Sequence, residues 1–128
     1  MLVSPADVVA KAKATIKECS VRDVRDCLNE GTVLIDIRER TEYQRGHLPG
    51  AMIIPRGLLE FEIIPALERL GTDTPVAEHD IVLYCGTGGR SALAAKSLDA
   101  MGFRNVKSMD GGIVAWAEAK LPLVTPTA

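Results

Sequence analysis

Residues 81–91 read IVLYCGTGGRS, an apolar run followed by a glycine-rich stretch. Four apolar residues predict a buried strand, the glycines that follow predict a tight loop, and the alanine-rich residues after Ser91 predict a helix. Cys85 stands where the strand passes into the loop. Backbone N–H groups of the loop and the positive end of the helix dipole should therefore surround its sulfur. We expect Cys85 to favour its thiolate form and interpret it as a reactive residue rather than a small apolar filler.

Short apolar segments alternate with helical patterns along the chain. Strands are predicted over 32–37, 51–54, 81–84 and 106–108, and helices over about 4–18, 20–31, 38–45, from Pro65 onward, 90–101 and 112–120. This alternation is typical of an α/β fold, in which a central parallel sheet of about five short strands carries helices on both faces. Functional residues gather at the carboxyl ends of such strands, where Asp36 and Cys85 both lie.

Size and charge limit the classes of partner. The chain has 128 residues and a net charge of -2, with its Lys and Arg residues spread along the sequence. One domain of this length can bury its own core, and a chain without a basic cluster is a poor candidate for binding nucleic acid. We find no apolar run long enough for a signal-peptide core or a membrane span, so no membrane partner is expected.

The cysteine pattern bears on the compartment. Cys19, Cys27 and Cys85 form no C-x-x-C pair, and their odd number does not suggest a disulfide framework. We therefore expect a reducing environment and a cytoplasmic location, with no metal and no cofactor.

An ordered series of motifs resembles the rhodanese-like sulfurtransferase family, in particular its single-domain members. The resemblance covers about residues 20–122 and leaves an N-terminal helical extension over 1–19 and a loose tail over 123–128. The matching motifs, in chain order, are Asp36-Ile37-Arg38 with Glu42-Tyr43, His47-Leu48-Pro49-Gly50-Ala51, Ile54-Pro55, the loop from Tyr84 to Ser91, and Gly111-Gly112 with Trp116.

The resemblance implies an enzyme of sulfur metabolism. Cys85 would attack a sulfur donor, either thiosulfate or a low-molecular-weight persulfide, hold the transferred sulfur as a persulfide, and pass it to cyanide, a thiol or a protein thiol. The loop around Cys85 would bind the reacting anion. Its members are Gly86, Thr87, Gly88, Gly89, Arg90 and Ser91.

Two arginines have alternative roles. Arg90 would either bind the anionic group of the donor or pair with a carboxylate that holds the loop. Arg38 would either contact the substrate or pair with an acid such as Asp36, which we interpret as an orienting residue. His47 lies in a turn, and we interpret it as structural.

Two other functions compete with sulfur transfer. Protein phosphatases and arsenate reductases of related architecture also use a cysteine-to-arginine anion loop, but they place five residues between the two where this chain places four. A tetrahedral phosphoryl group needs the larger ring, which makes this reading the weaker one. The second alternative is a non-enzymatic rhodanese-like binding or regulatory module, although such modules commonly lack the cysteine that this chain keeps.

Overall fold

The computed structural model describes residues 1–28 and 30–126. Five strands, all parallel, form one sheet in the order β1-β5-β4-β2-β3. The strands are β1 (Lys17–Cys19), β2 (Val33–Asp36), β3 (Met52–Ile53), β4 (Asp80–Tyr84) and β5 (Asn105–Met109). The α-helices are α1 (Pro5–Lys13), α2 (Val21–Cys27), α3 (Arg40–Gln44), α4 (Leu59–Glu68), α5 (Gly89–Met101) and α6 (Gly112–Glu118), and two short 3₁₀ helices are η1 (Arg56–Leu58) and η2 (Val76–Glu78).

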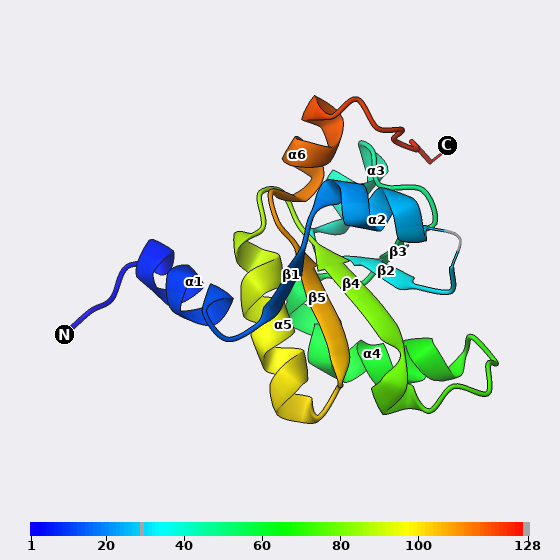
Figure 1. Ribbon diagram of the computed structural model, residues 1–128, viewed down its shortest axis with the longest axis horizontal. Coiled ribbons are helices and arrows are strands. Elements are labelled where there is room, and N and C mark those ends of the chain that lie inside the picture. Colours follow the sequence, from blue (N-terminus) through cyan, green and yellow to red (C-terminus); the bar gives the residue numbers. More distant parts are fainter. Residues whose placement is uncertain (29, 127–128) are drawn as a thin grey trace.

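Helices cover both faces of this sheet (Figure 1). α4 and α5 pack on one face, over a core that alternate residues of the central strands supply, such as Ile35, Leu83 and Cys85. α2 and α6 pack on the other face, over a core built on Leu34, Tyr84 and Trp116. Because neighbouring strand residues point to opposite faces, the two cores share strands but not side chains. The predicted α/β architecture, with a five-stranded parallel sheet, is confirmed.

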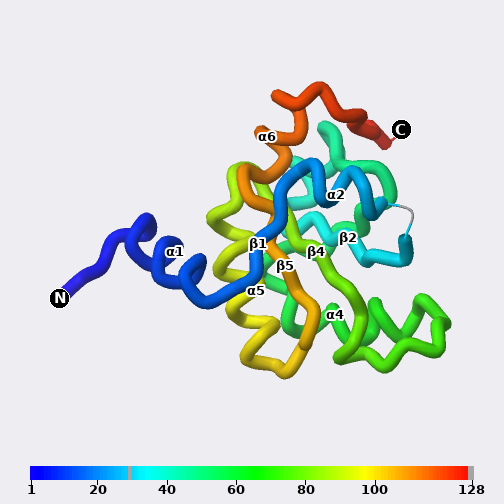
Figure 2. Tube along the Cα trace, viewed as in Figure 1, coloured from blue at the N-terminus to red at the C-terminus, as the bar shows by residue number. Residues whose placement is uncertain are grey.

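The N-terminal part of the chain differs from the prediction. α1 ends at Lys13 instead of near Glu18, and Lys17–Cys19 joins the sheet edge by pairing with β5. This strand has mixed polarity and is largely exposed, so its sequence gives no strand pattern, and only its partner strand determines its conformation. The chain trace shows α1 reaching away from the sheet, beside α5 (Figure 2).

Two further helix boundaries were predicted wrongly. α4 begins at Leu59, so Pro65 lies inside this helix and not at its start. The proline removes a backbone donor on a side of the helix where Phe61 and Pro65 are both exposed residues. α2 ends at Cys27, earlier than residue 31, and residue 29 of that predicted segment lies outside the described residues.

The predicted loose tail over 123–128 is tied down near its start. Val124 and His47 exchange two backbone hydrogen bonds of 2.8 and 2.9 Å, and the indole N–H of Trp116 donates to the carbonyl of Pro122. The ring of His47 is buried and stacks on Tyr43, in keeping with a structural role. Residues 127 and 128 of the predicted tail lie outside the described residues. No helix within residues 1–28 and 30–126 is both long and apolar enough to cross a membrane.

A buried carboxylate organises the end of β2. Asp36 is 0% exposed and accepts hydrogen bonds from Arg38, at 3.0 Å from Nε and 2.8 Å from Nη2, and from the hydroxyl of Tyr84 at 2.7 Å. The same Arg38 donates to the carbonyl of Gly46, and the Tyr84 oxygen accepts the N–H of Leu48. Burial and the negative charge of Asp36 raise the pKa of Tyr84 well above its usual value, which keeps the phenol a donor.

Asp36→Asn tests the energetic weight of this network. The substitution leaves the guanidinium of Arg38 buried without its counter-charge, so we expect a loss of about 3–5 kcal/mol in the free energy of unfolding. The measurement is chemical denaturation at neutral pH. Glu60→Gln is the matched control, because it removes one partner of the Arg56–Glu60 ion pair, whose side chains are about one-third exposed, and should cost less than about 1 kcal/mol. Equal losses in the two variants would contradict the prediction.

Candidate active site

The sulfur of Cys85 lies at the base of the loop that joins β4 to α5. The residue is 1% exposed, and its sulfur accepts the backbone N–H of Gly88 at 3.1 Å and that of Ser91 at 3.4 Å. Gly88 is the residue before α5 and has a φ of +105°, a left-handed conformation that favours glycine. The loop therefore surrounds Cys85 with backbone donors at the N-terminal end of a 13-residue helix, an arrangement that stabilises negative charge on sulfur.

The outer side of the loop is held by the start of α6. The N–H groups of Ile113 and Val114 donate to the carbonyls of Cys85 and Gly86 at 2.9 and 3.1 Å. In a trans peptide the N–H points opposite to the carbonyl, so these bonds turn the N–H groups of Gly86 and Thr87 away from α6. α6 thus sets the orientation of the first two peptide groups of the loop.

Glycine is required where the start of α6 meets the cysteine loop. A Cβ on Gly112 would lie 2.5 Å from the carbonyl oxygens of both Cys85 and Gly86, and the residue has a φ of +58°. A Cβ on Gly88 would lie 3.3 Å from the backbone nitrogen of Gly111. These distances show that the Gly111-Gly112 segment passes in close contact with the cysteine loop.

Arg90 connects the loop to a second element. Its guanidinium donates to both carboxylate oxygens of Glu42 on α3, at 2.9 and 3.2 Å. These hydrogen bonds raise the pKa of Arg90, with a smaller contribution from the nearby sulfur of Cys85. Of the two roles considered for Arg90, the structure contains the carboxylate pair, and the partly exposed guanidinium also lies near the sulfur.

The remaining predicted residues divide between the loop and its support. Asp36 and Arg38 bind each other in the buried network described above, and the guanidinium of Arg38 is enclosed there. Thr87 is exposed at the tip of the loop, while Gly89 begins α5 and lies against Val9 of α1. Ser91 is fully buried with its hydroxyl below the sulfur.

Sequence reasoning missed two residues of this site. Ser108, on β5, lies beneath the loop with its hydroxyl 2.7 Å from that of Ser91. A serine within a short strand gives no sequence signal of such a contact. Glu42 was recognised as part of a motif, but its pairing with Arg90 depends on how α3 and α5 are brought together.

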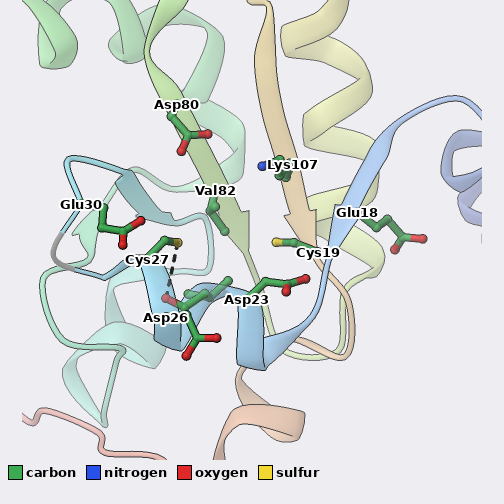
Figure 3. A pocket seen from close by; sticks show the side chains of 10 residues that line it. Glu18, Cys19, Asp23, Asp26, Cys27, Glu30, Asp80, Val82 and Lys107 are labelled. Atoms are coloured by element: carbon green, nitrogen blue, oxygen red, sulfur yellow. Dashed lines mark hydrogen bonds between the residues drawn. The ribbon is translucent and has the colours of Figure 1, made fainter.

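A separate hollow lies between α2 and the sheet, and Cys85 is not among the residues that line it. Its volume is about 480 Å³, and its walls carry Cys19 and Cys27 together with several carboxylates and Lys107 (Figure 3). The thiol of Cys27 donates to the carbonyl of Val24. Burial raises the pKa of Cys19 to about 11, so this thiol stays protonated at neutral pH. Cys19 packs with the core on the face of the sheet opposite to that of Cys85.

Gly112→Ala tests the contact between α6 and the loop. The new Cβ meets two backbone oxygens that cannot move without moving the loop. An alanine forced into a left-handed conformation costs roughly 1–2 kcal/mol by itself. We therefore expect Gly112→Ala to lower the free energy of unfolding by clearly more than this amount. Gly50→Ala supplies that reference, because Gly50 has a φ of +78° and open space around its Cβ position. Both variants are measured by chemical denaturation. Equal losses of unfolding free energy in Gly112→Ala and Gly50→Ala would contradict the importance of this contact.

Glu42→Gln tests the ion pair with Arg90. Hydrogen bonds from Arg90 lower the pKa of Glu42 from 4.5 to about 2, so the pair stabilises the folded chain above pH 4.5 and this contribution is lost as the pH falls toward about 2. At neutral pH we expect the variant to be less stable by at most about 1 kcal/mol, since the pair is partly exposed.

Denaturant titrations at a series of pH values provide the measurement for this pair. The difference in unfolding free energy between the native chain and Glu42→Gln should shrink as the pH falls through the acidic range. A difference that stays constant with pH would show that the ion pair is not its cause. Glu118→Gln is the control for loss of one surface carboxylate, because Glu118 forms no ion pair within the described part of the chain.

Comparison with known proteins agrees with this geometry. Residues 20–119 match the family model of the rhodanese-like domain. A sulfurtransferase of Allochromatium vinosum is 34% identical over 97 residues, which cover 76% of this chain and 82% of that protein. The probable adenylyltransferase/sulfurtransferase MoeZ of Mycobacterium tuberculosis is 38% identical over 103 residues, but these cover 79% of this chain and only 24% of MoeZ.

Solved structures extend the likeness to nearly the whole chain. A protein of unknown function from Rhodopseudomonas palustris, described as a possible tyrosine phosphatase, superposes with a TM-score of 0.80 at 30% identity and covers 97% of this chain and 96% of its own. The homodimeric polysulfide-sulfur transferase of Wolinella succinogenes gives a TM-score of 0.71 at 32% identity, over 94% of this chain and 87% of its own. With the family model spanning most of its length, this chain belongs to the rhodanese-like family and is related to sulfurtransferases.

Proposed function

We propose that this protein is a sulfurtransferase that carries sulfur as a persulfide on Cys85. The observation that supports this most directly is the pair of backbone N–H groups, from Gly88 and Ser91, directed at one buried sulfur. Backbone donors stabilise an anion without supplying or taking a proton. A thiolate held in this way can attack a donor sulfur without a neighbouring general base.

The reaction has two balanced steps. The Cys85 thiolate attacks the outer sulfur of thiosulfate, so that a new S–S bond forms while the S–S bond of the donor breaks and sulfite leaves with its electron pair. The persulfide then gives its outer sulfur to an acceptor such as cyanide or a thiol, which restores the thiolate. A low-molecular-weight persulfide serves as donor in the same way and leaves as a thiolate.

The surrounding residues divide the work of this reaction. The peptide groups oriented by α6 bind the developing negative charge, and Arg90, held by Glu42 beside the loop, presents a positive charge to an incoming anion. Asp36 and Arg38 support the loop through Tyr84, the residue before Cys85. A protein thiol is one candidate acceptor, because Thr87 at the tip of the loop is exposed. A reducing compartment such as the cytoplasm keeps the three free cysteines available.

Two alternatives carry weaker support. The likeness to a possible tyrosine phosphatase concerns the fold of that protein, and the loop here has four residues between Cys85 and Arg90, one fewer than a phosphoryl group requires. A non-enzymatic binding module would have no use for donors directed at a cysteine sulfur. Hydrolysis of a phosphate ester, or a complete lack of sulfur uptake, would favour the respective alternative.

Intact mass measures the proposed intermediate. After incubation with thiosulfate, and separately with glutathione persulfide, the native chain should gain the mass of one sulfur atom, and cyanide or a thiol should remove it. Cys85→Ser should gain nothing, while Cys19→Ser and Cys27→Ser should gain as much as the native chain, because both thiols lie outside the loop. Uptake that persists in Cys85→Ser, or that neither donor produces, would contradict the proposal.

A further inference from the structure

Two buried hydroxyls lie directly below the sulfur of Cys85. Ser91 and Ser108 are both 0% exposed, and their oxygens are 2.7 Å apart. The Ser91 oxygen is also 3.6 Å from the sulfur of Cys85 and 3.3 Å from the carbonyl of Gly88. The site above therefore rests on a three-membered chain of polar groups, from sulfur to hydroxyl to hydroxyl.

The protons of this chain can be placed one by one. Within residues 1–28 and 30–126, the oxygen of Ser108 has a single hydrogen-bond partner, the Ser91 oxygen, and either hydroxyl could be the donor. Only when Ser108 donates does its own proton have an acceptor, so this direction is the one that leaves no buried hydroxyl proton unpaired. Ser91 then has one proton of its own, which it can direct either to the Gly88 carbonyl or to the sulfur. With a neutral thiol, the S–H donates to the Ser91 oxygen and the Ser91 proton goes to the carbonyl.

Ionisation of the sulfur reverses one bond of the chain. When the thiol proton has left for solvent, the Ser91 hydroxyl can rotate and donate to the thiolate. The Gly88 carbonyl keeps a partner, because it also accepts the N–H of Ala92 at 3.1 Å. Every buried group thus remains satisfied in both states, which avoids the cost of an unpaired polar group.

We propose that Ser108 is a positioning residue that, by donating to Ser91, keeps the Ser91 proton free to turn toward the Cys85 thiolate. Without this donor, the Ser91 oxygen would keep only the Gly88 carbonyl and the sulfur as partners, and the shortest of its three contacts would be lost. The inference rests on the proposed function for its biological role, since the thiolate is the species that attacks the donor.

The place of Ser108 in the sheet supports this role. Ser108 pairs with Leu83 in register, and both residues point to the face that α5 covers. Leu83 packs there in an apolar core, with Cys85 two residues further along the same face. A hydroxyl at such a position costs desolvation that an apolar residue would avoid, and Ser91 is the partner that compensates for it.

A double-mutant cycle tests the inference. The variants are Ser91→Ala, Ser108→Ala and the combination, with the ionisation of Cys85 followed by the ultraviolet absorbance of its thiolate across pH, as the difference from the matching Cys85→Ser chain. One lost hydrogen bond to the thiolate should move the midpoint upward by about 0.5 to 1 pH unit in Ser91→Ala. Ser108→Ala should move it in the same direction by less, and the double variant should titrate like Ser91→Ala.

Controls separate this effect from a general loss of packing. Ser97→Ala removes a hydroxyl from the same helix as Ser91, where the partner is Arg56, and should leave the titration unchanged. Ser108→Thr keeps a hydroxyl at this position and should titrate closer to the native midpoint than Ser108→Ala does. A Ser108→Ala chain that titrates like the native protein, or shifts that add in the double variant, would overturn the inference. If the titrations follow the expected pattern but the native chain takes up no sulfur, the role of Ser108 stands and only the proposed function is contradicted.

Discussion

The structure depends on the contact between the start of α6 and the carbonyls of Cys85 and Gly86. Two backbone hydrogen bonds and a glycine with a left-handed conformation bring α6 within van der Waals limits of the cysteine loop. Because each carbonyl turns its peptide group as a rigid unit, holding these two carbonyls determines where the N–H groups of Gly86 and Thr87 point. The orientation of these first two peptide groups thus depends on a segment that is distant in sequence, whereas the sulfur receives its two backbone donors from Gly88 and Ser91 within the loop and at the start of α5.

Two polar networks brace this loop from opposite sides. Below the loop, Ser91 and Ser108 connect the sulfur to β5 on the α5 face of the sheet. On the other face, the phenol of Tyr84 binds Asp36, whose charge Arg38 balances. Tyr84 and Cys85 are neighbours in sequence, so the alternation of a single strand sends one network to each face. Buried polar networks of this kind rigidify a site when every member is satisfied, and the described residues contain no buried side-chain polar atom without a partner.

Most of the architecture could be predicted because its signals are local. The strand before Cys85, the glycine-rich loop and the helix after it each follow from residues within a few positions of one another. Two errors arose where distant segments decide. Lys17–Cys19 becomes a strand only because β5 offers a free edge. Val124 is held by His47, which the composition of the tail does not indicate. The start of α4 was misplaced for a local reason, since Pro65 lies inside this helix and not at its first turn.

By itself, the sequence determined that a thiol enters a glycine-rich loop at the start of a helix, since strand, turn and helix signals are contiguous around Cys85. The family motifs likewise identified Asp36 and Arg38 as residues near the site. Only the tertiary structure decided which groups meet there. Neither the pairing of Arg90 with Glu42 nor the contact of Ser91 with Ser108 leaves a trace in sequence spacing, because each joins elements that come together only when the sheet is complete.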